Sequence, residues 1–161
     1  MSTIDPIEVA LELTSRLDEA LKQCNKEKKA IPRRANDIAS LLTQLGLTPT
    51  ITFYLSKSSN KERIYSNLIE YLLGRTDSVG SFICEDVSNE GDGYSILLAL
   101  IIASLTKLGH IKESEVPTNY RKLIDYLKQV RRDYKVEYLI ERSLSQIVIE
   151  FKKLLNALYE V

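Results

Sequence analysis

The chain has 161 residues, which fits a single domain that can bury roughly two thirds of its unfolded surface. Lys plus Arg and Asp plus Glu each number 22, so the net charge is zero and a strongly basic nucleic-acid-binding protein is excluded. The amino-terminal sequence lacks a secretion signal, and the longest apolar run, residues 96–103, is too short to cross a bilayer. We therefore expect a soluble, cytoplasmic protein.

The first expected helix begins at Asp5 and Pro6, which combine an N-cap residue with a first-turn proline. Its apolar residues recur at spacings of three and four as far as Cys24, which indicates an amphipathic helix that packs in a bundle. A basic segment follows at residues 26–34, and we expect Pro32 to interrupt the helical hydrogen bonding there.

Two apolar helical runs then meet at a glycine. The first run, residues 35–45, ends at Gly46, a residue type that readily adopts positive φ. Pro49 suits the first turn of the next helix, which we expect to end at Lys57. We therefore predict a helix, a glycine corner and a second helix.

Residues 60–93 contain an expected helix followed by an acidic segment. Asn60 is the expected N-cap of a helix running to Leu73. Residues 77–93 contain five acidic residues and no Lys or Arg, so we expect an exposed acidic loop, anchored by apolar residues at its middle. The anchors are Val79, Phe82 and Ile83.

Residues 94–108 are apolar almost all round, a pattern typical of the central buried helix of a bundle. Further helices are expected to begin at Pro117 and Thr118, and after Arg132, the last of them running to about Tyr159. No stretch alternates at period two for long enough to indicate a sheet. We predict an all-α, single-domain bundle of six to seven helices over residues 1–161, with one irregular acidic loop at 77–93.

Catalytic and metal-binding patterns are weak. Cys24 and Cys84 are 60 residues apart with no CxxC motif, which we interpret as reduced thiols rather than a disulfide or a zinc site. The single histidine, His110, follows a glycine and is interpreted as a helix-end residue rather than a general base. The acids Asp86, Glu90 and Asp92 lack calcium-loop spacing, so no metal site is predicted. Since no catalytic or cofactor-binding motif is recognised either, no cofactor and no enzymatic activity are predicted.

Charge is distributed unevenly along the sequence: residues 1–75, 76–117 and 118–161 carry net charges of +2, −5 and +3. The basic clusters fit two interpretations, namely solvated helix ends or a groove that follows a nucleic-acid backbone without reading its sequence. A further cluster, Arg131, Arg132 and Lys135, could extend such a groove. The candidate nucleic-acid-binding residues are Lys26, Lys28, Lys29, Arg33, Arg34, Lys57, Lys61 and Arg63.

The run LLTQLGLTPTITFYLSK at residues 41–57 resembles the small, all-helical subunit of Cmr-type (type III-B) CRISPR effector complexes, and residues 151–157 are similar to that family's closing helix. The resemblance implies a non-catalytic subunit that stacks in several copies along the complex and contacts the backbones of guide RNA and target RNA. Its partners would be the other subunits and further copies of itself, without a membrane. It assigns Gly46 to the helix corner, Phe53 to packing and Lys57 to a basic contact.

The long acidic loop departs from the compact pattern of that family. Segregated charges also suit head-to-tail stacking, with the acidic loop of one copy against a basic surface of the next. Two alternatives remain: a helical scaffold that binds proteins and never RNA, and a small helical enzyme with a pocket at His110 or at the acids between 86 and 92.

Overall fold

The computed structural model describes residues 4–88 and 91–159, and within these ranges the chain is entirely helical apart from turns and connections. The predicted all-α fold is confirmed. No helix among these residues is long and apolar enough to span a membrane. The elements in chain order are α1 (Pro6–Leu21), α2 (Ala30–Leu45), α3 (Leu47–Lys57), α4 (Glu62–Leu72), the 3₁₀ helix η1 (Ser81–Asp86), α5 (Tyr94–Lys107), the 3₁₀ helix η2 (Glu113–Glu115), α6 (Tyr120–Arg131) and α7 (Tyr134–Tyr159).

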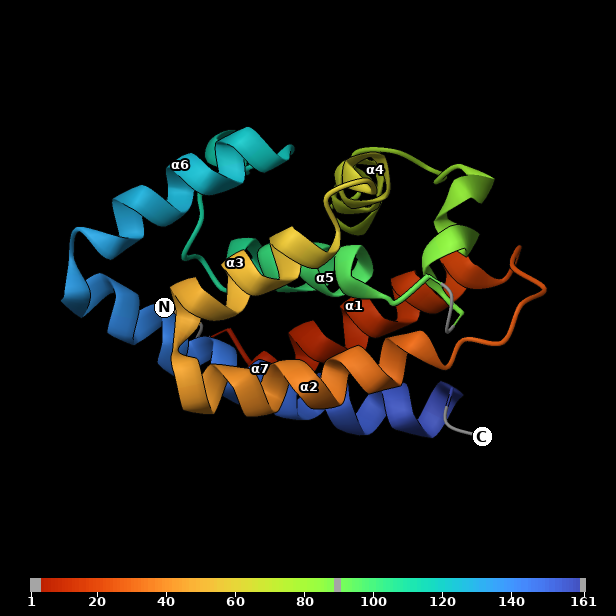
Figure 1. Cartoon of the computed structure of the whole chain (residues 1–161), viewed down its shortest axis with the longest axis horizontal. Helices are drawn as coiled ribbons and strands as arrows, with labels where there is room; N and C mark the ends of the chain where they lie inside the picture. The colour runs from red at the N-terminus through yellow and green to blue at the C-terminus, as the bar shows by residue number, and fades with distance from the viewer. Residues whose placement is uncertain (1–3, 89–90, 160–161) are drawn as a thin grey trace.

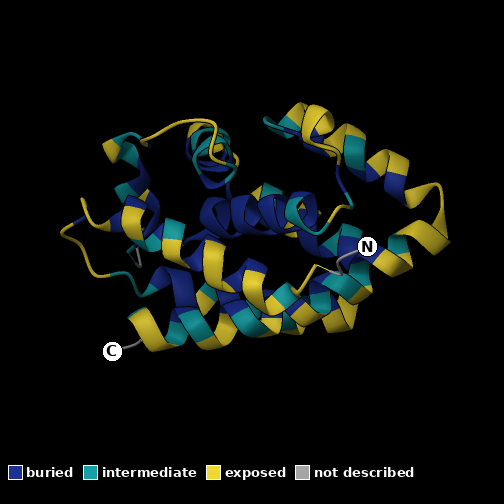
Figure 2. Ribbon diagram, turned by 180° about the vertical axis from the view of Figure 1, so that it is seen from behind, coloured by how far each residue is buried: buried dark blue, intermediate teal, exposed yellow. Residues whose placement is uncertain are grey.

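Helix α5 forms the centre of the molecule, as its composition predicts. Every residue from Tyr94 to Thr106 is buried (Figure 2). The buried hydroxyls of Ser104 and Thr106 donate to the carbonyls of Leu100 and Ile102, at 2.6 and 2.9 Å, so these polar groups are satisfied within the helix. An apolar helix of this kind is stable only when other elements cover all of its faces.

The other helices surround α5. Helices α1, α2 and α7 pack together on one side of it and α4 packs on the other, while α6 and the start of α7 form a hairpin at one end of the molecule (Figure 1). Helix α6 buries only one face, through Leu123, Leu127 and Val130. The α6–α7 hairpin is therefore the least enclosed part of the fold.

The predicted corner between α2 and α3 is confirmed at Gly46, which has φ of +87°. The carboxylates of α7 hold this corner: Glu141 Oε1 accepts from the backbone N–H of Leu47 at 2.7 Å, and Glu137 Oε2 accepts from the Thr48 hydroxyl at 2.7 Å. The Glu141 bond satisfies a backbone N–H that the first turn of a helix leaves without a partner, and the Glu137 bond adds a side-chain contact beside it. The corner thus depends on residues about ninety positions away in the sequence.

Four predicted boundaries are wrong. Helix α6 begins at Tyr120, after its N-cap Asn119, rather than at Pro117 and Thr118. Helix α2 begins at Ala30 rather than near residue 35, with Pro32 in its first turn, where a missing N–H removes no helical hydrogen bond. Helix α1 ends at Leu21, before Cys24, and Lys61 rather than Asn60 precedes α4. Arg33 and Arg34 consequently lie on a helix and not in a basic loop.

The prediction of an exposed loop at 77–93 holds only for part of that segment. Asp77 and Ser78 are exposed, but the middle forms η1, and Ile83, Asp86 and Val87 are buried. The predicted anchors Val79, Phe82 and Ile83 all contact the core. Apolar residues at three- and four-residue spacing thus fold this acidic segment against the helices.

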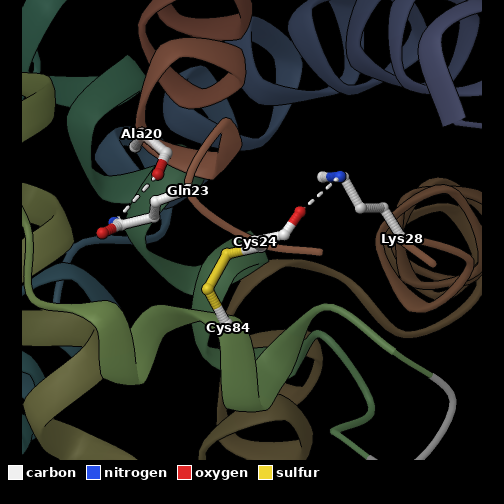
Figure 3. The surroundings of a disulfide bond; sticks show 5 residues. All are labelled: Ala20, Gln23, Cys24, Lys28 and Cys84. Carbon is white, nitrogen blue, oxygen red and sulfur yellow. Dashed lines mark hydrogen bonds between the residues drawn. A yellow bond between two sulfur atoms is a disulfide. The ribbon is translucent and has the colours of Figure 1, made fainter. Parts of the chain in front are cut away.

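The interpretation of the cysteines as reduced thiols is also wrong. Cys24 and Cys84 form a disulfide with a Cα–Cα distance of 5.3 Å (Figure 3). The bond joins the α1–α2 connection to η1, two segments that also meet where the N–H of Ala30 donates to the carbonyl of Val87 at 3.2 Å. This proximity arises from the tertiary fold, so no spacing rule reveals it.

Replacing Gly46 with alanine is expected to destabilise the protein by about 2 kcal/mol, because the backbone there is in a region that nearly excludes residues with a side chain. The new Cβ would also lie 2.8 Å from Glu141 Oε1, which caps α3. The matched control is Gly74→Ala, which also has positive φ but has no atom within 4 Å of the added carbon. Equal losses in chemical denaturation would contradict the role assigned to the Glu141 contact.

Reducing the disulfide is expected to lower the free energy of unfolding by about 4 kcal/mol, because it releases a cross-link that closes a long loop in the unfolded chain. Guanidinium titrations with and without a reductant measure this loss. The double variant Cys24→Ser/Cys84→Ser should match the reduced protein and show no response to the reductant. Detection of two titratable thiols in protein purified without reductant would contradict the bond.

Candidate nucleic-acid interface

Five of the eight basic residues predicted from sequence have contacts that place them around one segment, residues 82–94, of which 82–88 and 91–94 are described. The Arg63 guanidinium lies 4.3 Å from the centre of the Phe82 ring, the Lys61 ammonium donates to the carbonyl of Gly91, and Arg34 donates to the Tyr94 hydroxyl. Lys28 donates to the carbonyl of Cys24, which the disulfide joins to this segment (Figure 3). The fold therefore gathers basic residues that are separate in sequence.

The fifth basic residue, Lys57, reaches this segment through an aromatic cluster. Phe53, Tyr54 and Tyr94 pack with ring centres 4.9 to 6.2 Å apart, and the Lys57 ammonium lies 5.6 Å from the centre of the Phe53 ring. Tyr54 and Tyr94 are buried and belong to the core. Phe53, assigned to packing by the family resemblance, keeps 38% of its surface exposed. It is the solvent-facing member of this cluster.

Arg34 is held firmly by the protein. Its guanidinium donates to the Tyr94 hydroxyl at 2.6 Å, pairs with Asp37 at 2.8 Å and lies 4.7 Å from the centre of the Tyr94 ring. Its side chain is only 15% exposed. Arg34 therefore joins α2 to the start of α5, and little of its surface can meet a phosphate.

Lys61 is engaged in a similar way. Its ammonium lies 3.2 Å from Asp86 Oδ1 and donates to the Gly91 carbonyl at 2.6 Å. Asp86 is fully buried and its carboxylate accepts three further hydrogen bonds at the amino-terminal end of α5, from Gly93 N–H, Ile96 N–H and the Ser95 hydroxyl. The pair is thus a structural link between the start of α4 and the start of α5.

Sequence reasoning missed this role of Asp86. Burial raises the pKa of Asp86, while the Ser95 hydrogen bond and the positive charge of Lys61 act in the opposite direction. The available signal was an acidic residue between the apolar residues Ile83 and Val87, a few positions before the predicted central helix. That pattern fits a buried acid that caps a helix better than an exposed loop.

The remaining candidates reach solvent. Lys26, Arg33, Lys57 and Arg63 are exposed and Lys28 is half-buried, and within the described ranges none of them lies within 4.0 Å of a carboxylate. Lys29 pairs with Glu27 at 3.3 Å. These five residues, Lys26, Lys28, Arg33, Lys57 and Arg63, are named the open cations below.

Acidic and basic charge are neighbours in space, although they are separate in sequence. The exposed acids Glu85 and Asp92 belong to the same segment that the basic residues surround. The described part of the acidic segment therefore lies among the basic residues, and head-to-tail stacking of copies stays a prediction. The cluster of Arg131, Arg132 and Lys135 lies at the α6–α7 turn, at the other end of the molecule, and does not extend the basic surface (Figure 1).

The groups considered for catalysis do not converge with one another. His110 follows the end of α5, as predicted, lines a cavity, and has its Nε2 2.8 Å from the Ser143 hydroxyl. Asp86 lies elsewhere, bound to Lys61, so the enzyme alternative retains only the His110 cavity. Glu90, one of the acids considered for a metal, lies outside the described residues. Among the residues that are described, no three His, Cys, Asp or Glu side chains are grouped to hold a metal ion.

Comparison of the chain with protein-family models, curated proteins and solved structures gives no match. The resemblance of residues 41–57 to the Cmr small subunit therefore stays a prediction.

Replacing Lys61 with alanine is expected to cost about 3 kcal/mol of stability at neutral pH, because it leaves the buried Asp86 carboxylate without its ion-pair partner. Since burial already raises the pKa of Asp86, the cost should shrink as the pH falls and the carboxyl becomes protonated. Denaturant titrations at several pH values measure both effects. Lys26→Ala, at an exposed position, should change stability by no more than roughly 0.5 kcal/mol, and a similar loss in both variants would contradict the role of Lys61.

Proposed function

We propose that this chain is a non-catalytic small subunit of a type III-B CRISPR ribonucleoprotein, in which copies of it line an RNA backbone during antiviral defence. The proposal combines the sequence resemblance at residues 41–57 with the basic residues whose contacts place them around residues 82–94, of which 82–88 and 91–94 are described. Guide and target RNA supply the sequence information, and the protein supplies charge and a rigid helical body.

The open cations are the observation that carries the proposal. Their charges are not neutralised by carboxylates of the described chain, so they can exchange counterions for phosphates without first breaking an ion pair. Such contacts set position and do not read bases. The exposed Phe53 ring beside Lys57 adds an aromatic face of the kind on which unpaired bases stack.

The zero net charge limits the strength of this contact. With the acids Glu85 and Asp92 among the basic residues, the long-range field is small and steering toward RNA is weak. We therefore expect isolated protein to bind RNA only at low salt. In an assembly, neighbouring subunits would hold the open cations against the backbone and raise their effective concentration.

A ribonucleoprotein subunit of this type would work in the cytoplasm. The disulfide restricts the kind of organism in which a cytoplasmic protein could keep this bond. Most cells keep cytosolic thiols reduced, but intracellular proteins of hyperthermophiles are commonly disulfide-rich. The proposal therefore combines best with a hyperthermophilic source, in which Cys24–Cys84 would persist inside the cell.

One observation favours the alternative of a protein-binding scaffold. The α6–α7 hairpin exposes large apolar side chains that the described chain leaves uncovered: Ile124, Tyr134, Val136, Tyr138 and Leu139. Exposed apolar side chains on two consecutive helices are the kind of feature that contact surfaces for other proteins use. A subunit of a complex would use such a surface as well, so RNA binding is the property that separates the two functions.

Neutralising Lys28, Arg33 and Lys57 to glutamine is expected to weaken binding of a fluorescent 20-nucleotide oligouridylate. The plot of log Kd against log salt should lose about 2 units of slope, since each lost phosphate contact releases less counterion, by about 0.7 per contact for single strands. Fluorescence anisotropy between low and moderate salt measures the slope. These positions avoid Arg34 and Lys61, whose loss would disturb the fold.

The matched control neutralises Lys128, Arg132 and Lys135, three exposed residues near the α6–α7 turn, and should leave the slope unchanged. Equal losses in both triple variants would show non-specific attraction and overturn the interface. Absence of RNA from the complex that co-purifies with the chain from its native cell would favour the scaffold.

A further inference from the structure

A cavity of about 660 Å³ lies between the connection after α5 and the α6–α7 hairpin. Its volume is within the range of roughly 300–1,000 Å³ that small-molecule sites occupy. None of the candidate nucleic-acid-binding residues lines it. The cavity is thus separate from the proposed RNA contacts, and its ligand has to be inferred from its own lining residues.

Polar and apolar side chains both line the cavity, and the apolar residues form one part of its wall. Ile111, Val116, Val130 and Ile140 line it and are themselves buried, at 2 to 6% exposure, so the wall is part of the folded core. Val136 adds an apolar side chain that is 42% exposed. A ligand with an apolar body would remove this surface from water.

The charged groups at the cavity favour a cation. Glu115, Asp125 and Asp133 line it against a single lysine, Lys122, which leaves a net charge of −2. Asp133 accepts backbone hydrogen bonds from Lys135 and Val136 at the start of α7. Within the described residues, Glu115 and Asp125 have no ion-pair partner, so their carboxylates can receive an ammonium group.

Two further groups bear on the ligand. Burial lowers the pKa of His110, so its imidazole adds no positive charge at neutral pH. The Tyr126 hydroxyl is buried and has no hydrogen-bond partner among the described residues, an arrangement that is unfavourable without an additional polar group. Burial raises the pKa of Tyr126 to about 12, so the hydroxyl stays protonated and can donate.

We propose that this cavity binds a small organic cation, an amine carried on an apolar body, with its ammonium group at Glu115 and Asp125 and its body against the apolar wall. The site is independent of the proposed RNA contacts. Binding would attach the η2 connection to α6, and so stiffen the least enclosed part of the molecule.

Phenethylamine is the probe, titrated into the full-length protein with detection by ¹H–¹⁵N correlation spectra. We expect shifts for Val116, Tyr126 and Gln129. Three matched compounds separate the contributions: 2-phenylethanol lacks the charge, 3-phenylpropionate reverses it, and ethylamine lacks the apolar body. Each should bind at least tenfold more weakly than phenethylamine.

Asp125→Asn should weaken phenethylamine binding about tenfold, and Gln129→Trp, at an exposed cavity position, should abolish it by filling the space. Asp77→Asn, an exposed acid outside the cavity, should have no effect, and thermal melts confirm that each variant folds. Equal binding of 2-phenylethanol, shifts confined to other residues, or no binding at 10 mM probe would overturn the proposal. Displacement of phenethylamine by a basic peptide of tenfold higher affinity would overturn the small-molecule occupant in favour of a partner protein's side chain.

Discussion

The burial of α5 is the constraint that the rest of the structure satisfies. A helix that is apolar on every face must be covered on every face, and the chain achieves this with α4, α3 and η1 together with α1, α2 and α7. The amino-terminal end of the same helix carries the buried Asp86 carboxylate, which requires Lys61 and three hydrogen-bond donors. The arrangement of α4, η1 and the start of α2 follows from covering this one helix.

Local patterns in the sequence predicted the features that depend on local physics. The all-round apolar run identified α5, and Gly46 after an apolar stripe identified the helix corner, because periodicity and backbone freedom are properties of neighbouring residues. Pro32 misled the prediction of α2, since a proline that ends one helix and a proline in the first turn of the next look alike in sequence. Boundaries of this kind depend on where the helix packs.

The candidate site could be predicted only in part, because it depends on contacts between residues that are distant in sequence. The sequence shows that basic residues cluster along the chain, but which of them reach solvent depends on partners far along the chain. Arg34 donates a hydrogen bond to Tyr94, 60 residues away, and Lys61 pairs with Asp86, 25 residues away. Cys24 forms a disulfide with Cys84, 60 residues away. Net charge per segment likewise failed to predict the surface, because the fold places the acidic segment among the basic residues.

The disulfide also changes what a break in the main chain would do. Helices α2, α3 and α4 all lie between Cys24 and Cys84, so they belong to a covalently closed ring of backbone. A protease that cuts once inside this ring leaves both products joined through sulfur and still packed on α5. Cleavage before or after the ring leaves two pieces that no covalent bond joins, so the oxidised molecule stays one covalent unit after a single cut in its middle and not after one near its ends.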